Sequence, residues 1–207
     1  MGFPHARANI ITRHEFKMIG SHFWVSLAKN VWRTLFCLTV LACVVGCGQQ
    51  KVGADISGYH WQRFTPKDQN FSVLFPKIPK IKISSEQTAI GKIEVHAYIA
   101  EVDAQTAYGM AFNDYPTNFD VSDPPKIFNE SIKSCLKIGY QIISQTDEKV
   151  ESYPGMKIVL GNGDFRDSMK IFLVGSRLYQ LNSIYATNNP HFDDLEKFMN
   201  SFSLTQQ

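Results

Sequence analysis

A stretch without charged residues, 34–46, divides the chain into a leader and a remainder and so limits which residues can belong to a folded domain. Lys29 and Arg33 precede it, and the nearest acidic residue before it is Glu15. A basic segment followed by about 7–15 apolar residues and a small-residue exit is typical of a secretory signal. A helix that spans a bilayer needs about 20 apolar residues, so this stretch is short for a permanent span. We therefore expect residues 1–46 to be a signal peptide with a helical apolar part.

The stretch ends in the sequence V-V-G-C at residues 44–47, which resembles the bacterial lipobox: an aliphatic residue, a tolerant position, a small residue and a cysteine. The resemblance implies cleavage before Cys47 and attachment of diacylglycerol and a further acyl chain such as palmitate, which anchor a protein firmly when two or three chains are present. The sequence V-L-A-C at residues 40–43 is a weaker match, so Cys43 is the second choice for the lipid. The alternatives are an ordinary signal peptide or an N-terminal membrane helix.

The electrostatic character of the chain changes when the leader is set aside. The leader carries five of the 21 basic residues and one of the 19 acidic residues, which leaves 16 basic and 18 acidic residues after it. The net charge of +2 for the whole chain thus comes from the leader, and the rest has a formal charge of −2. Nucleic-acid binding, which needs a basic surface, is therefore not expected.

The remaining residues are sufficient for one folded domain with its own hydrophobic core. Residues 47–58 contain three glycines and no apolar period, so we expect a lipidated tether there. Residues 59–207 are expected to form a single domain. A start at Met18 would give the leader a more usual length, so the signal peptide is expected to begin at residue 1 or at residue 18.

Short apolar runs predict strands on both sides of a central helix. Between Ile93 and Ile99, apolar residues alternate with others, the pattern of a strand with one buried face. We expect turns at Pro154-Gly155, at 161–164 and at Gly175-Ser176, because these sequences favour tight connections between strands. The strands are expected over 71–75, 81–88, 93–102, 106–112, 141–151, 156–161, 168–174 and 177–186.

Two helices are expected, over 124–138 and 191–201. Asp123 is a suitable N-cap for the first helix, two prolines suit its first turn, and Gly139 is a natural residue for its end. The order is then four strands, a helix, four strands and a helix, with short turns that favour antiparallel pairing. We expect the α+β class: an antiparallel sheet of about six to eight strands with two main helices packed on it.

The strand sequence F-S-V-L-F-P at 71–76, followed by Pro79 and preceded by Trp61, Arg63 and Phe64, resembles the opening of a large group of bacterial exported domains that are mostly uncharacterised. These domains share a pattern of the form F-x-V-x-F-P-x-x-P. The layout is also similar to the PsbP-like fold, whose lipoprotein members accompany photosystem assemblies in cyanobacteria. The resemblance continues through Tyr108, 114–116, 153–155, 172–181 and 198–202.

The resemblance covers nearly the whole domain, with one departure at Met156-Lys157, where many members of the group carry an arginine after Pro-Gly. The group has no known activity, and a fold by itself does not determine a function. The resemblance therefore implies a fold and an exported location, but no binding residues.

No arrangement of residues predicts catalysis, a metal site or a cofactor. His60, His96 and His191 are far apart in the sequence and lack metal-ligand spacing, so surface or partly buried histidines are expected. Cys135 is the one cysteine after Cys47, and its place on the apolar side of the first helix predicts a buried, inert thiol rather than a nucleophile. It also leaves no disulfide partner within the domain.

Two acidic pairs could suggest other chemistry. The 161–164 turn with Asp167 is rich in oxygen ligands, but it lacks the twelve-residue calcium loop, so a plain hairpin is expected. Asp193 and Asp194 are helix neighbours that point about 100° apart, which favours interaction with the helix dipole over a catalytic pair. Seven aromatic residues could line a groove, although half-buried sheet aromatics are the commoner explanation: Tyr59, Trp61, Tyr108, Tyr115, Tyr153, Tyr179 and Tyr185.

We therefore expect a membrane-anchored envelope lipoprotein that is a non-catalytic accessory or binding module. Its expected partners are the membrane, through the lipid on Cys47, and an unidentified envelope protein. The alternative is an envelope enzyme or small-ligand carrier whose site converges from distant strands. Gly48, rather than an aspartate, follows the cysteine, which favours an outer membrane over an inner one in a Gram-negative cell, with the domain in the periplasm or at the cell surface.

Overall fold

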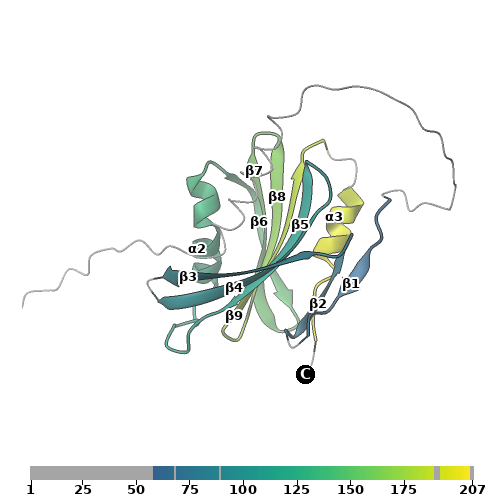
Figure 1. Ribbon diagram of the computed structural model, residues 1–207. Helices are drawn as coiled ribbons and strands as arrows, with labels where there is room; N and C mark the ends of the chain where they lie inside the picture. Colours follow the sequence, from purple (N-terminus) through teal and green to yellow (C-terminus); the bar gives the residue numbers. More distant parts are fainter. Residues whose placement is uncertain (1–57, 68, 89, 189–191, 206–207) are drawn as a thin grey trace, which may run out of the picture.

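The computed structural model describes residues 58–67, 69–88, 90–188 and 192–205. The expected signal peptide, and the tether up to residue 57, lie outside these residues. The main sheet has seven antiparallel strands: Lys80–Thr88 (β3), Gly91–Glu101 (β4), Thr106–Asp114 (β5), Gln141–Val150 (β6), Tyr153–Asn162 (β7), Phe165–Val174 (β8) and Arg177–Ala186 (β9). Their order across the sheet is β3-β4-β5-β9-β8-β7-β6, so β3 and β6 are its edges (Figure 1).

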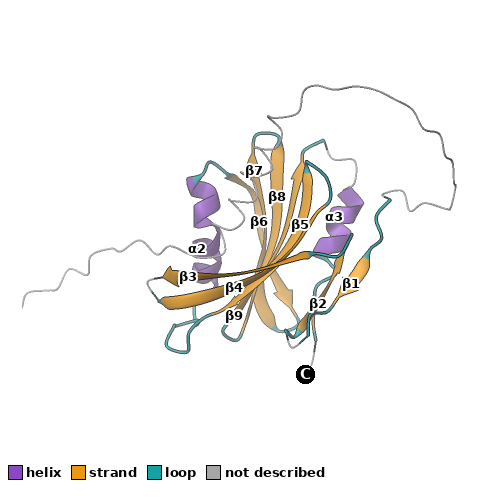
Figure 2. Ribbon diagram, viewed as in Figure 1, coloured by secondary structure: helices purple, strands orange, loops and turns teal. Residues whose placement is uncertain are grey.

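A smaller sheet and two helices cover the main sheet. The smaller sheet contains Gln62–Phe64 (β1), Phe71–Phe75 (β2) and Ser203–Leu204 (β10), with β2 in the middle. The helices are Pro124–Lys137 (α2) and Phe192–Met199 (α3), and they lie on opposite sides of the main sheet (Figure 2). The expected α+β class, with an antiparallel sheet and two main helices, is confirmed.

Helix α2 begins at the predicted residue, Pro124, and ends at Lys137, one residue before the predicted end. The Asp123 carboxylate accepts a hydrogen bond from the backbone N–H of Lys126 at 3.2 Å, and two prolines occupy the first helical positions, where no intrahelical donor is needed. Gly139 follows the helix with a φ of +98°, a conformation that glycine adopts without steric cost. The backbone N–H of Tyr140 then bonds to the carbonyl of Cys135 at 3.1 Å, which closes the end of the helix.

The connections between strands agree with expectation at two hairpins and differ at a third. Tight turns at Gly163-Asp164 and Gly175-Ser176 join β7 to β8 and β8 to β9, as expected. The predicted turn at Pro154-Gly155 is wrong, because both residues belong to β7 and the turn precedes them, where Glu151 has a φ of +54°. A Cβ atom on Gly155 would lie 2.3 Å from the Phe172 ring, so this glycine serves close packing between β7 and β8.

Two apolar cores lie on the two faces of the main sheet. The core under α2 receives these helix residues: Ile127, Phe128, Ile132 and Cys135. The core on the other face joins β2 and the following α3 residues: Leu195, Phe198 and Met199. Side chains of β4, β5, β8 and β9 enter one core or the other in alternation, which is the period-2 pattern of strands covered on both faces. The domain thus has three layers, with the long sheet in the middle.

Arg177 contacts three separate parts of the chain. Its guanidinium bonds to both carboxylate oxygens of Asp114 at 2.7 Å and lies over the Phe112 ring, 4.4 Å from the centroid. It also donates to the backbone carbonyl of Gln69 at 3.3 Å. A bidentate arginine–carboxylate pair fixes geometry as well as charge. This contact joins the start of β9, the end of β5 and the loop before β2.

Candidate functional site

Two histidines, His60 and His96, lie within the part of the chain that the structure describes. His60 is exposed, and His191 lies outside the described residues. His96 stacks on the Phe112 ring at 4.7 Å, and its Nε2 lies 2.7 Å from a carboxylate oxygen of Glu94. Among the described residues, no three His, Cys, Asp or Glu side chains are placed to hold a metal ion together. Stacking on Phe112 and the contact with Glu94 therefore explain the position of the His96 side chain on the sheet.

Cys135 is a buried free thiol, as the sequence predicts. Burial is the main cause, and the nearby Asp167 carboxylate a smaller one, of a rise in its pKa to about 12. A thiol with that pKa stays protonated at neutral pH, and the thiolate is the reactive form. Cys135 thus contributes to the core under α2 and is a poor nucleophile.

The acidic residues of the sequence also separate in space. Asp164 is exposed in its turn, while Asp167, three residues later, is only 3% exposed and points into the core under α2. The two carboxylates therefore do not form a calcium loop, and the expected hairpin is confirmed. Asp194 is buried and Asp193 is exposed, in agreement with the divergence of neighbours on a helix.

The aromatic residues divide between the two cores. Tyr108 and Tyr179 are buried in the core on the α3 side, and Tyr115 is buried in the core under α2. The ring of Trp61 meets Tyr108 edge-on at 5.6 Å. Because these rings lie on opposite faces of the sheet, the set does not line one groove. Packing in and around the sheet explains them.

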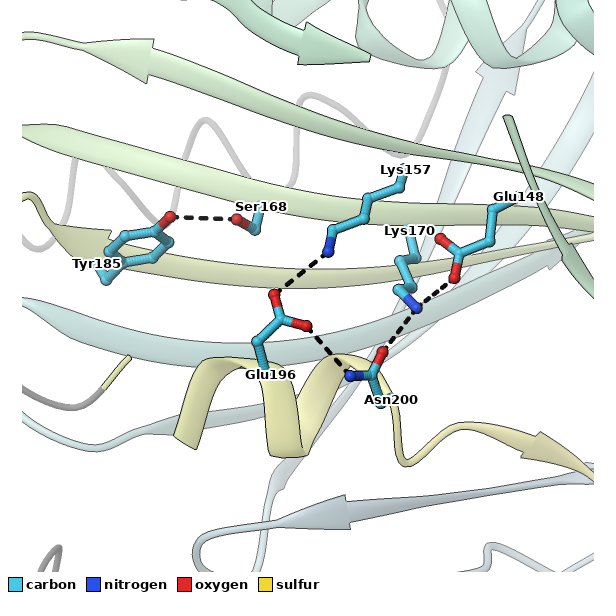
Figure 3. A network of polar contacts seen from close by, with 7 residues as sticks. All are labelled: Glu148, Lys157, Ser168, Lys170, Tyr185, Glu196 and Asn200. Carbon is cyan, nitrogen blue, oxygen red and sulfur yellow. Dashed lines mark hydrogen bonds and ion pairs between the residues drawn. The ribbon is translucent and has the colours of Figure 1, made fainter. Parts of the chain in front are cut away.

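A network of charged side chains lies between α3 and the neighbouring strands, and we call these five residues the α3-face network: Glu148, Lys157, Lys170, Glu196 and Asn200. Figure 3 shows the contacts running from Lys157 through the helix residues to Lys170 and Glu148. Lys157 Nζ lies 3.2 Å from Glu196, whose other oxygen accepts a bond from Asn200 at 3.1 Å. Lys170 donates to Asn200 at 3.0 Å and pairs with Glu148. Four segments of the chain thus meet in one set of polar contacts.

The sheet register explains why this network is needed. Lys157 and Lys170 stand directly opposite each other on β7 and β8, so two positive charges are neighbours on one face. Like charges in this position are destabilising unless acidic groups lie close by. Glu196 on α3 and Asn200, the first residue after this helix, are four positions apart and contact the two lysines from the same side. The network therefore holds α3 against the polar part of the sheet, beside the apolar contacts of the core.

A second polar group is buried under α2. The amide of Asn182 on β9 donates to both carboxylate oxygens of Asp167 on β8, at 3.2 and 3.3 Å. Burial raises the pKa of Asp167 to about 7, and the bond from Asn182 opposes that rise. The amide oxygen of Asn182 is buried and has no hydrogen-bond partner in the described part of the chain. A protonated Asp167 can supply the missing donor, since a carboxylic acid carries one O–H. This pair can therefore hold a proton near neutral pH.

The surface of the domain carries two groups of exposed apolar side chains, one at each edge of the main sheet. Around the β3 edge, Ile78, Ile81 and Ile83 are 78%, 63% and 57% exposed. Around the β6 edge, the exposed apolar residues are Leu136, Ile138, Ile142 and Ile143. Clustered exposed apolar residues, unlike scattered ones, indicate a surface that meets another molecule.

Sequence reasoning missed the α3-face network and the Asp167–Asn182 pair. A signal for the pair was present in the spacing of β8. Asp167 is two residues before Met169, which is followed at the same spacing by Ile171 and Leu173, so all four lie on one buried face of the strand. The network had no comparable signal. Its residues come from four separate segments, and only the pairing of β7 with β8 places the two lysines together.

No family model matches the sequence, and no curated protein matches it. Among solved structures, the chain is similar to the solution structure of cyanobacterial PsbP (CyanoP) from Synechocystis sp. PCC 6803, with a TM-score of 0.50 and 10% sequence identity over 78% of this chain and 98% of that one. The chain has a PsbP-like fold. A protein of unknown function from Pseudomonas aeruginosa, PA94, aligns with a TM-score of 0.39 and 8% identity over 67% of this chain and 92% of that one.

Within the described residues, no helix has the length and apolar character that crossing a membrane requires. At 10% identity the likeness to CyanoP concerns the fold, and it transfers no residue roles.

Proposed function

We propose that this chain is a lipid-anchored protein of the bacterial cell envelope whose domain is an accessory or binding module. The observation that carries the proposal is the V-V-G-C sequence at 44–47, which closes an uncharged stretch behind a basic segment. The described domain begins at residue 58, so a tether of 48–57 separates Cys47 from it. In this proposal, two or three acyl chains on Cys47 hold the domain at the membrane surface.

The exposed apolar residues support a binding role. A domain with two such groups, at opposite edges of one sheet, has two surfaces that gain from contact with another molecule. The chain further belongs, in this proposal, to the exported domains with the F-x-V-x-F-P-x-x-P pattern, and its β2 carries that pattern in the core beside α3. We also propose an outer-membrane location in a Gram-negative cell, because Gly48 follows the cysteine.

Metabolic labelling with palmitate tests the anchor. The full chain, the Cys47→Ala variant and the matched Cys43→Ala variant are expressed in a bacterium with lipoprotein processing enzymes. We expect label on the full chain and on Cys43→Ala, and none on Cys47→Ala. Equal labelling of wild type and Cys47→Ala would refute the assignment, and loss of label in Cys43→Ala alone would move the anchor to Cys43.

The binding role is tested by co-purification of the lipidated protein with its neighbours after cross-linking in the membrane. A partner that is captured by the full chain and lost when Ile142 and Ile143 are changed to serine supports a binding module. Serine at these exposed positions leaves the cores unchanged, so an unaltered unfolding midpoint serves as the control. Identical capture by the variant and the wild type counts against the β6 edge as the binding surface.

A further inference from the structure

The segment of residues 77–83, with the sequence K-I-P-K-I-K-I, combines the most exposed apolar side chains of the described domain with three lysines. Lys77, Lys80 and Lys82 are all exposed. Lys80 forms an ion pair with Glu101 at 3.1 Å, and the lysine side chain is still 77% exposed to solvent. Basic residues interleaved with aliphatic ones, on a surface rather than in a core, match the chemistry of an anionic lipid headgroup region.

The position of this segment relative to the start of the domain gives a second, independent observation. In the smaller sheet, Gln62 pairs with Phe75, so the first strand of the domain starts beside the last residue of β2. Ile78 follows Phe75 by three residues, and Gly58 precedes Gln62 by four. The chain therefore enters the domain next to the segment. A tether of 48–57 spans at most roughly 35 Å, since an extended chain covers about 3.5 Å per residue.

We propose that segment 77–83 lies on the surface of the anionic bilayer that holds the lipid on Cys47, so that the main sheet stands on the membrane by its β3 edge. This inference rests on the proposed function, because it takes the lipid anchor as given. It adds an orientation of the domain: the β3 edge faces lipid, and the β6 edge, at the other end of the strand order, faces away.

The geometry of an edge strand allows both kinds of side chain to reach the bilayer. On β3, Ile81 lies opposite Tyr98 and Lys82 lies opposite Ala97, so isoleucines and lysines project to opposite faces of the sheet. Strand β3 pairs with a neighbouring strand on one side only. When its free side meets a flat surface, side chains on both faces of the strand can therefore reach that surface. The isoleucines then enter the headgroup boundary, while the lysine stems extend along it with their ammonium groups at the phosphates.

Position-specific photo-cross-linking to lipid tests this orientation on the full-length chain. A benzoylphenylalanine is placed at Ile81 or, as the matched control, at Ile142, which is exposed on the opposite edge. The protein is reconstituted into vesicles of phosphatidylglycerol with phosphatidylcholine, and into vesicles of phosphatidylcholine alone. Covalent attachment of phospholipid is measured by mass spectrometry after illumination, and palmitate is measured on the same samples.

We expect several-fold more lipid attachment at position 81 than at position 142, and a decrease at position 81 when phosphatidylglycerol is omitted. Lys77→Gln should lower attachment at position 81 by roughly fivefold, the effect of one lysine near an anionic surface. Equal lipid attachment at positions 81 and 142 overturns the proposal. Attachment at position 81 that is unchanged both without phosphatidylglycerol and in Lys77→Gln also overturns it.

The two proposals fail in different ways. A chain without palmitate refutes the anchor, and the comparison of positions 81 and 142 on the fraction that still binds anionic vesicles then tests the orientation separately. A chain with palmitate and equal attachment at both positions keeps the anchor and refutes the orientation. A chain that does not bind vesicles at all refutes both.

Discussion

Replacing Asp167 with asparagine tests the buried carboxyl directly. Asp167 is 3% exposed and its carboxylate receives only the Asn182 amide among the contacts that the structure describes. Asparagine has nearly the same shape and stays neutral at every pH. Its oxygen can accept from Asn182, and its own N–H can donate to the Asn182 oxygen that has no partner in the described part of the chain. We expect Asp167→Asn to become more stable, relative to wild type, as the pH rises.

The sign and size follow from the pKa of Asp167, which burial raises from 3.8 to about 7 in the folded domain. Between these values the folded state holds a proton that the unfolded state has released, so the contribution of Asp167 to stability is largest below pH 4 and is lost as the pH rises to 7. Each pH unit in this interval corresponds to about 1.4 kcal/mol. The whole interval therefore corresponds to a change of about 4 kcal/mol in the difference between variant and wild type.

Urea unfolding at a series of pH values from 4 to 8 measures this difference in the free energy of unfolding. The matched control is Asp164→Asn, the same chemical change at an exposed position in the adjoining turn. Using differences between variant and wild type removes the contribution of the other titrating groups. A difference for Asp167→Asn that is constant from pH 4 to pH 8, or that favours the wild type as the pH rises, would show that Asp167 is not buried as the structure places it.

Three further predictions concern the helices and the core. Lys170→Met leaves Glu148 and Asn200 without their shared donor and should lower the free energy of unfolding by about 2 kcal/mol, measured by urea unfolding; an unchanged value would show that the α3-face network contributes nothing. Asp123→Ala removes the N-cap of α2 and should cost about 1 kcal/mol in the same assay, while Asp123→Asn, which can still cap, should cost much less. The Cys135 thiol should resist a thiol reagent at pH 8 in the folded protein and react in urea; rapid labelling without denaturant would contradict its burial and its pKa of about 12.

Local signals in the sequence were sufficient for much of the fold. Asp123 and Gly139 mark the ends of α2 because capping depends on residues that are adjacent in the chain. The hairpins at Gly163 and Gly175 are also determined by neighbouring residues, because each glycine adopts a positive φ within a tight turn. The sequence therefore predicted four of the five strands before α2, the four strands between α2 and α3, and both helices, all in their correct order.

Features that depend on distant pairing were not predicted. Strands β1 and β10 have three and two residues, too few to show a period, and they exist because both pair with β2. Pro154-Gly155 has the composition of a turn, but its environment is decided by Phe172 on the neighbouring strand. Lys157 and Lys170 become neighbours only through the register of β7 and β8. In each case the deciding contact joins segments that are separate in the sequence.

The smaller sheet has a consequence for how the domain is made. Strand β2 lies between β1, near the start of the described domain, and β10, far along the chain, so its hydrogen bonding is complete only after residues 203–204 are available. A chain synthesised from its N-terminus keeps one side of β2 unpaired until residues 203–204 have been made, and contacts between distant segments form slowly. The pairing of Ser203 and Leu204 with β2, although it involves only two residues, then completes the smaller sheet.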